Sequence, residues 1–204
     1  MYRGALRRQL LTLLAAFLVY ATHTQARDLQ TGDIIFQDSQ SSQSQAIKAA
    51  TRSPFCHVGM IVMRNGNPFV AEAVQPVSLT PLGTWISRGR NAQYVVKRLK
   101  ALELDPQSKE KLWAETKRYL RKNYDWQFGW SDREIYCSEL VWKIYQRSLG
   151  IELCDLKSLQ DFNLSDPVVR KTLAERYGKS IPLSEPVVAP SDLFQSTRLV
   201  TIAN

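Results

Sequence analysis

The sequence is poor in residues that bind metals or form disulfides. It has only two histidines and three cysteines among 204 residues. An odd number of cysteines leaves at least one thiol unpaired even in an oxidising compartment. The chain also lacks an internal repeat, a low-complexity tract and a recognisable linker. We therefore predict one domain without a metal or a cofactor.

Long runs of like charge are absent as well. Residues 27–204 carry 24 basic and 19 acidic side chains, which is a mildly basic balance without a Lys/Arg block. Such a balance favours anionic partners, such as cell-wall carboxylates or phospholipid head groups. It does not indicate a nucleic-acid partner.

The first 26 residues have the organisation of a secretory signal. Arg3, Arg7 and Arg8 precede an apolar run over residues 10–20, and the segment then turns polar and ends at Ala26. Because this run is too short to span a bilayer, we predict cleavage after Ala26 and a periplasmic or secreted protein. An uncleaved anchor is the alternative. No later stretch is apolar enough for a transmembrane segment, so residues 27–204 form the predicted domain.

The remaining pattern predicts an α+β fold. Apolar runs rich in β-branched residues alternate with amphipathic segments that carry helix caps, such as Asp105 before Pro106 and Asp166 before Pro167. We predict strands at residues 32–37, 57–63, 69–74 and 94–99, and helices at residues 44–51, 105–121, 136–149 and 166–178.

The second and third strands form a predicted hairpin, because Asn65-Gly66 lies between them. With a two-residue turn, paired residue numbers sum to 131, so His57 and Glu72 lie diagonally on one face of the sheet. Diagonal neighbours are about 7–8 Å apart at the backbone, which these side chains can span. Gly59, opposite Glu72, leaves room for the carboxylate to orient the imidazole as a base. An ordinary polar pair on a half-exposed sheet is the alternative.

Cys137 begins a predicted helix whose apolar face continues through residues 140, 141, 144, 145 and 149. A helix start offers unpaired N–H groups and the positive end of the helix dipole, and both stabilise a thiolate. The N–H groups around Cys137 and Ser138 are also suited to hold an oxyanion. His57 is the only histidine after residue 26, so Cys-His chemistry would have to use it. A buried structural cysteine is the alternative.

Two further cysteines and an aromatic stretch remain. Cys56 and Cys154 either form a disulfide that leaves Cys137 free, or all three thiols are free. Six aromatic residues between 119 and 136 either line a cleft beside the thiol or simply pack.

The residues around Cys137 resemble a known superfamily. Residues 122–126 and 136–141 resemble the nucleophile region of NlpC-type cell-wall peptidases, and residues 31–36 resemble their Gly-Asp-aliphatic strand. In ordinary members Cys precedes His, whereas here His57 precedes Cys137. This order is similar to the circularly permuted papain-like branch, and most similar to its YiiX/YebB-like group. The resemblance covers about residues 29 to 196.

The resemblance implies a circularly permuted papain-like fold, with an antiparallel sheet packed against the nucleophile helix. It implies Cys137 as nucleophile, His57 as base, Glu72 as orienting residue and Tyr124 as a group facing the oxyanion or substrate. The expected activity is amide hydrolysis through a thioester, with peptidoglycan stem peptides as substrate. A lipid ester or amide hydrolase, or an acyltransferase of the same fold, is the second hypothesis. A non-catalytic module that binds an amino acid or peptide is the third.

Overall fold

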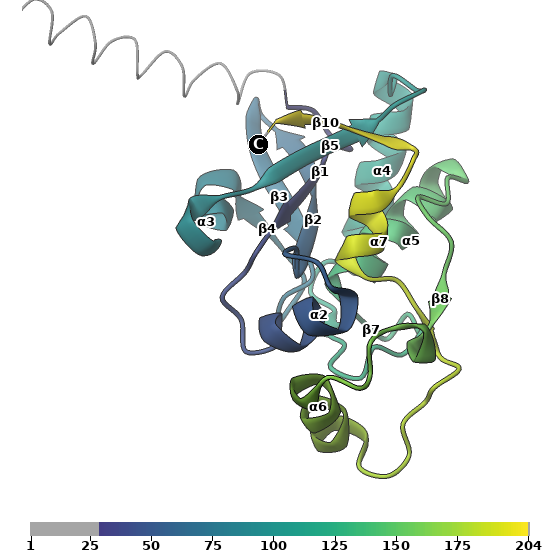
Figure 1. Cartoon of the computed structure of the whole chain (residues 1–204). Coiled ribbons are helices and arrows are strands. Elements are labelled where there is room, and N and C mark those ends of the chain that lie inside the picture. The colour runs from purple at the N-terminus through teal and green to yellow at the C-terminus, as the bar shows by residue number, and fades with distance from the viewer. Residues whose placement is uncertain (1–28, 204) are drawn as a thin grey trace, which may run out of the picture.

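The computed structural model of the protein describes residues 29–203, so the predicted signal at residues 1–26 lies outside the described residues (Figure 1). The described chain forms a six-stranded sheet with the order β10-β5-β1-β2-β3-β4. All neighbouring strands in it are antiparallel. The predicted α+β fold with an antiparallel sheet is therefore confirmed.

The main sheet has six strands, and six α-helices and two short strand pairs accompany it in the described chain. The strands of the main sheet are β1 (Ile34–Gln37), β2 (His57–Arg64), β3 (Asn67–Glu72), β4 (Ser78–Pro81), β5 (Val95–Leu99) and β10 (Leu199–Ala203). The α-helices are α2 (Ser44–Thr51), α3 (Leu82–Ser87), α4 (Pro106–Tyr119), α5 (Cys137–Leu149), α6 (Pro167–Tyr177) and α7 (Pro190–Gln195). Two short pairs lie apart from the sheet: β6 (Asn123–Tyr124) with β7 (Glu134–Ile135), and β8 (Lys157–Ser158) with β9 (Pro186–Val187).

Alternating side chains divide the core between the two faces of the sheet. Val58, Met60 and Val62 of β2 join the large apolar cluster that contains the buried face of α5. Ile61 of β2 and Val70 of β3 point to the other face, where they pack in a smaller cluster with α3. The sheet is therefore buried on both faces, with the larger core on the side of α5.

Helix α5 organises the larger face. It packs on β2 and contacts both α4 and α7. Helix α2 packs against α6, and Figure 1 shows this pair together at one end of the molecule. No helix between residues 29 and 203 combines the length and apolar character needed to cross a bilayer.

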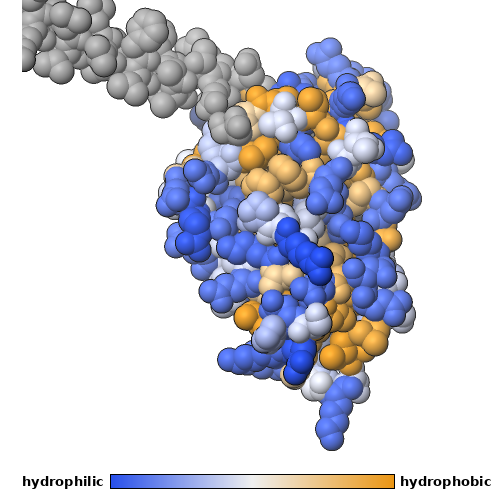
Figure 2. Space-filling view, viewed as in Figure 1, coloured by the Kyte–Doolittle hydropathy of each residue, from blue (hydrophilic) through white to orange (hydrophobic). Residues whose placement is uncertain are grey.

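The outer surface mixes hydrophilic and hydrophobic residues. Hydrophilic residues cover most of the face seen in Figure 2, and hydrophobic ones show between them in small groups. Strand β10 is an edge strand of the main sheet, and its Val200 and Ile202 are exposed. Single exposed apolar residues of this kind are normal on a folded protein.

Most predicted elements are present with small changes at their ends. Helix α2 has the predicted bounds, and α5 begins at Cys137 with Gly150 as its C-cap. Strand β3 lies two residues nearer the turn than predicted. Strand β10 and the short strands β6 to β9 were not predicted. Nor were β4 and α3, which together place side chains beside Glu72.

Candidate active site

The β2–β3 hairpin has the predicted register. Paired residues run from Arg64 with Asn67 to Met60 with Ala71, so their numbers sum to 131 throughout. Asn65 and Gly66 both have positive φ, 50° and 78°, as a two-residue turn of this hand requires. A Cβ atom at Gly59 would lie 2.4 Å from the Val70 side chain. Glycine therefore permits the close approach of the two strands below Glu72.

Glu72 is fully buried, and both of its carboxylate oxygens have hydrogen-bond partners. Its Oε2 lies 2.7 Å from Nε2 of His57. Its Oε1 accepts hydrogen bonds from the Thr80 hydroxyl and from the Arg88 guanidinium. Burial alone raises the pKa of a carboxyl group, but the bonds from His57, Thr80 and Arg88 outweigh it and lower the pKa of Glu72 to about 2. Glu72 is therefore a carboxylate near neutral pH.

His57 lies between Glu72 and Cys137. Burial disfavours the charged imidazole, but hydrogen bonds with Cys137 and Glu72 overcome this and raise the pKa of His57 to about 9. Because Nε2 faces Glu72, Nδ1 is left to face the sulfur. Trp85 stacks on the imidazole at a centroid distance of 5.9 Å. These contacts hold the ring in one orientation.

Cys137 and His57 meet at the end of the sheet. His57 is the first residue of β2, and its side chain leaves toward the face that carries Trp85. The following residue, Val58, packs on the opposite face with α5. The start of α5 therefore reaches the imidazole around the end of the strand and not across a face.

Contacts with a distant segment fix the start of α5. The Ser138 hydroxyl donates to the Val188 carbonyl at 2.7 Å, and the Val188 N–H donates to the Tyr136 hydroxyl at 3.2 Å. The hydroxyl hydrogen of Ser138 is already used in this bond, so only its backbone N–H remains as a donor for a ligand. The first N–H groups of the helix, those of Cys137 and Ser138, have no partner within it.

Glu139 also stabilises this helix start. It is fully buried, accepts from the backbone N–H of Tyr136 at 3.3 Å and pairs with Lys143 at 2.7 Å. It lines neither cavity described below. Its contacts show how an acidic residue is accommodated two positions after the thiol.

Tyr124 reaches the site from β6. Its backbone N–H donates to the Gln75 side chain at 2.7 Å. Burial first, and then the charge of Cys137, raises the pKa of Tyr124, while a hydrogen bond from the Gln43 side chain opposes that rise. Tyr124 lines the polar cleft together with His57 and Gln43.

Two cavities meet at this constellation. A polar cleft of about 610 Å³ is lined by His57, Tyr124, Trp126, Arg88 and several glutamines, namely Gln37, Gln40, Gln43 and Gln75. A smaller pocket of about 90 Å³ is lined by Cys137 and by apolar side chains from α2, α6 and the residues before α7. Ile47 lines both. Cys137 therefore lines the apolar pocket, whereas His57 and Tyr124 line the polar cleft.

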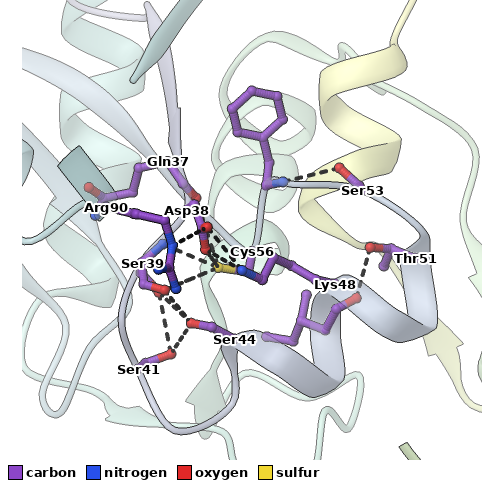
Figure 3. Close-up of polar contacts among 12 residues, drawn as sticks. Gln37, Asp38, Ser39, Ser41, Ser44, Lys48, Thr51, Ser53, Cys56 and Arg90 are labelled. Carbon is purple, nitrogen blue, oxygen red and sulfur yellow. Dashed lines mark hydrogen bonds and ion pairs between the residues drawn. The ribbon is translucent and has the colours of Figure 1, made fainter. Parts of the chain in front are cut away.

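Cys56 lies in the wall of the polar cleft. Its sulfur accepts from the Ser39 backbone N–H at 3.2 Å and lies 3.5 Å from Asp38. Burial first, with the negative charge of Asp38 adding to it, raises the pKa of the Cys56 thiol. Asp38 in turn accepts from Lys48 at 2.8 Å and from Arg90 at 2.9 Å. Figure 3 shows this network joining the end of β1 to α2.

All three cysteines are free thiols in the structure. The alternative of a Cys56–Cys154 disulfide is therefore wrong for this structure, and three free thiols is the arrangement present. Asp38 and Ser39 surround Cys56, whereas the backbone carbonyl of Cys154 accepts from the Trp142 indole at 2.8 Å.

The structure brings the predicted residues Cys137, His57, Glu72 and Tyr124 together, with Ser138 beside them. Sequence reasoning missed Thr80, Trp85, Arg88 and Gln43. The first three come from β4, α3 and the residue after it, which are too short to show a periodic pattern. Gln43 precedes a helix that was predicted, but nothing local places it near Tyr124.

The fold and the site together define a papain-like architecture in which the histidine strand precedes the cysteine helix. The family model described as "Permuted papain-like amidase enzyme, YaeF/YiiX, C92 family" matches residues 28–203. The chain belongs to this family, which supports a cysteine hydrolase.

Known relatives agree with this assignment. The chain is 51% identical over 174 residues to the uncharacterized protein YiiX of Escherichia coli strain K12, covering 85% of this chain and 86% of that protein. It is also similar to the crystal structure of YiiX from Escherichia coli O157:H7, with a TM-score of 0.83 and 51% identity. That match covers 86% of this chain and 97% of the other.

YiiX from Escherichia coli O157:H7 is described as a metalloprotein. Within residues 29–203 of the present chain, no group of three or more His, Cys, Asp or Glu side chains is arranged to hold a metal ion. The side chains around Cys137 do not fit such a centre, since Glu72 is already bonded by His57, Thr80 and Arg88.

Proposed function

We propose that the protein hydrolyses an amide bond through a thioester, with Cys137 as nucleophile, His57 as acid and base, and Glu72 as the residue that orients His57. The observation that carries the proposal is the position of one imidazole between a buried carboxylate and a thiol at a helix start. A raised pKa of His57 favours an imidazolium beside a thiolate at neutral pH.

The proposed reaction has two stages. The Cys137 sulfur attacks the carbonyl carbon, and His57 gives its proton to the departing amine as the carbon–nitrogen bond breaks. Water then attacks the thioester while His57 takes one of its protons, and the acid leaves as the sulfur is regenerated. Glu72 remains a carboxylate throughout and stabilises the imidazolium.

The carbonyl oxygen becomes an oxyanion in both stages. The N–H groups at the start of α5 have no partner within the helix and can bind such an oxyanion. The Tyr124 hydroxyl is a further donor in this proposal, because Tyr124 lines the polar cleft together with His57. A Tyr124→Phe variant tests this role, with a lower kcat and a nearly unchanged KM as the expected result.

The substrate combines features that fit both cavities. The pocket beside Cys137 is lined almost entirely by apolar side chains, which favours an acyl group with an apolar part. A lipid amide or ester is therefore our first substrate class. The glutamine-lined cleft favours a peptide amide instead, and on that observation a peptidoglycan stem peptide is the second candidate.

Incubation with purified muropeptides and, separately, with phospholipids and N-acyl amines, followed by mass spectrometry, distinguishes these classes. Release of a fatty acid with intact muropeptides supports the lipid class. Shortened muropeptides with intact lipids support the stem-peptide class. An unchanged result for the Cys137→Ala variant in either arm contradicts the proposed chemistry.

A binding module without turnover is the competing class of function. The rate of alkylation of Cys137 distinguishes a binding module from a hydrolase. A thiolate held beside an imidazolium alkylates at pH 6, whereas an ordinary exposed thiol is largely protonated there. If iodoacetamide modifies Cys137 at pH 6 no faster than it modifies glutathione, the binding module becomes the better proposal.

Export to the periplasm or beyond the cell, with removal of residues 1–26, completes the proposal. It is supported by the basic, apolar and polar order of that segment. Mass spectrometry of the protein from the exported fraction tests it, with Arg27 as the expected first residue.

A further inference from the structure

The apolar pocket beside Cys137 has one charged side chain in its wall. Among the described residues that line it, Arg176 alone carries a full charge, and most of the others are aliphatic or aromatic. Arg176 lies in the last turn of α6 and is half-buried. A cation in such a wall loses hydration, and burial accordingly lowers the pKa of Arg176.

No carboxylate among residues 29–203 lies within ion-pair distance of Arg176. Its Nη2 donates to the Gln43 side chain at 2.5 Å, and its guanidinium lies 4.5 Å from the centre of the Phe128 ring. Asp125 is close enough to favour the charge but does not form a pair with it. A guanidinium has five N–H donors, and the bond to Gln43 uses one of them. Arg176 therefore lacks a counter-ion within the described chain and has donors left over.

The orientation of Arg176 indicates which anion it would accept. The guanidinium carbon lies over the Phe128 ring and one N–H donates to Gln43, so the other N–H donors remain for a ligand. An edge-on guanidinium binds a planar carboxylate through two parallel hydrogen bonds. One positive charge in a small apolar pocket also matches a single negative charge better than two.

We propose that Arg176 is a specificity-determining residue that recognises a carboxylate on the substrate, next to the apolar part that occupies the pocket beside Cys137. This inference rests on the proposed function and narrows its substrate class to amides or esters that are both apolar and anionic. Gln43 is the positioning residue, because its side chain accepts from Arg176 and also lines the polar cleft that contains His57 and Tyr124.

A matched pair of alkylating reagents tests this site without knowledge of the natural substrate. In 2-bromodecanoate and 2-bromodecanamide, the thiolate attacks C2, the sulfur–carbon bond forms and bromide leaves with the bonding electrons. The two reagents share one chain and differ in charge. The rate ratio of acid to amide at Cys137, divided by the same ratio for glutathione, measures recognition of the carboxylate.

Three variants separate charge from structure. Arg176→Gln removes the cation, and we expect the normalised ratio to fall by roughly tenfold to hundredfold, as for loss of one charge-assisted contact. Gln43→Glu keeps Arg176 but supplies an internal counter-ion, so the same fall is expected. Arg176→Lys keeps the charge and is expected to retain part of the preference. If Arg176 had only a structural role, its replacement would slow the reactions of both reagents equally.

Several results would overturn the inference. It is wrong if the wild-type ratio equals that of glutathione, or if Arg176→Gln leaves the ratio unchanged. It is also wrong if decyl methyl phosphate protects Cys137 from iodoacetamide better than decanoate does. Failure of the neutral amide to modify Cys137 at all would instead contradict the proposed function, so the two failures are distinguishable.

Discussion

Two thiols lie beside His57, and their surroundings differ. Cys56 precedes His57 in the chain and is enclosed by Asp38 and Ser39, so burial and a nearby carboxylate favour its protonated form. Cys137 begins a helix and faces the imidazole itself. Two thiols close to one histidine therefore have opposite electrostatic surroundings. The sign of the charge that the sulfur meets distinguishes the two positions.

The largest expected loss of activity comes from replacing the thiol of Cys137. Cys137→Ala should reduce hydrolysis to background, because the nucleophile is removed, a loss of roughly 10³-fold or more. Cys56→Ala should lower activity by less than about tenfold, since its sulfur makes only structural contacts. Activity of both variants on the same substrate is the measurement, and comparable losses would remove the distinction between them.

His57→Ala should lower kcat/KM by roughly 10²- to 10⁴-fold, the range typical of general acid–base catalysis. The fall is expected in kcat more than in KM. Peptide mapping after a short iodoacetamide pulse at pH 6 provides the second measurement. The wild-type protein should be labelled at Cys137 and not at Cys56, and the variant at neither. If Cys137 is still labelled in His57→Ala, the imidazole does not stabilise the thiolate.

Glu72→Gln should change the pH dependence. Without the carboxylate the pKa of His57 falls from about 9, so the alkaline limit of activity moves to lower pH. Stability follows the same contact. The pKa of His57 is raised from 6.5, so its contribution is complete below pH 6.5 and is lost as pH rises through about 9.

The pKa of Glu72 is lowered from 4.5, so its contribution is complete above pH 4.5 and is lost as pH falls through about 2. The difference in Tm between wild type and Glu72→Gln should therefore be greatest near pH 5 to 6 and should shrink above pH 9. A difference independent of pH would contradict the ion pair.

Gly59→Ala should have the smallest effect among these changes. Its Cβ would lie 2.4 Å from Val70 and 2.8 Å from the Ala71 carbonyl, so the strands must separate. The expected cost in unfolding free energy is about 1–3 kcal/mol, as for other overpacked sites. Urea unfolding measures it. Because Glu72 would shift relative to His57, kcat should fall as well while Cys56 keeps its surroundings.

The sequence predicts the central part of the site for local reasons. Asn65-Gly66 fixes the hairpin register and thereby the relation of His57 to Glu72, while the apolar periodicity after Cys137 places that residue at a helix start. The rest depends on packing between distant segments. Arg88 follows a short helix with no periodic signal, and Arg176 meets Gln43 across the α2–α6 contact. No local pattern encodes such a contact.

The backbone contacts of Val188 make the site depend on a segment far from it in the sequence. The Val188 carbonyl and N–H hold Ser138 and Tyr136, on either side of the thiol in the sequence. The segment from β9 to α7 therefore holds the start of α5, and with it Cys137, in place. A cut in that segment would displace Cys137 from His57 although none of the residues of the proposed reaction lies in it.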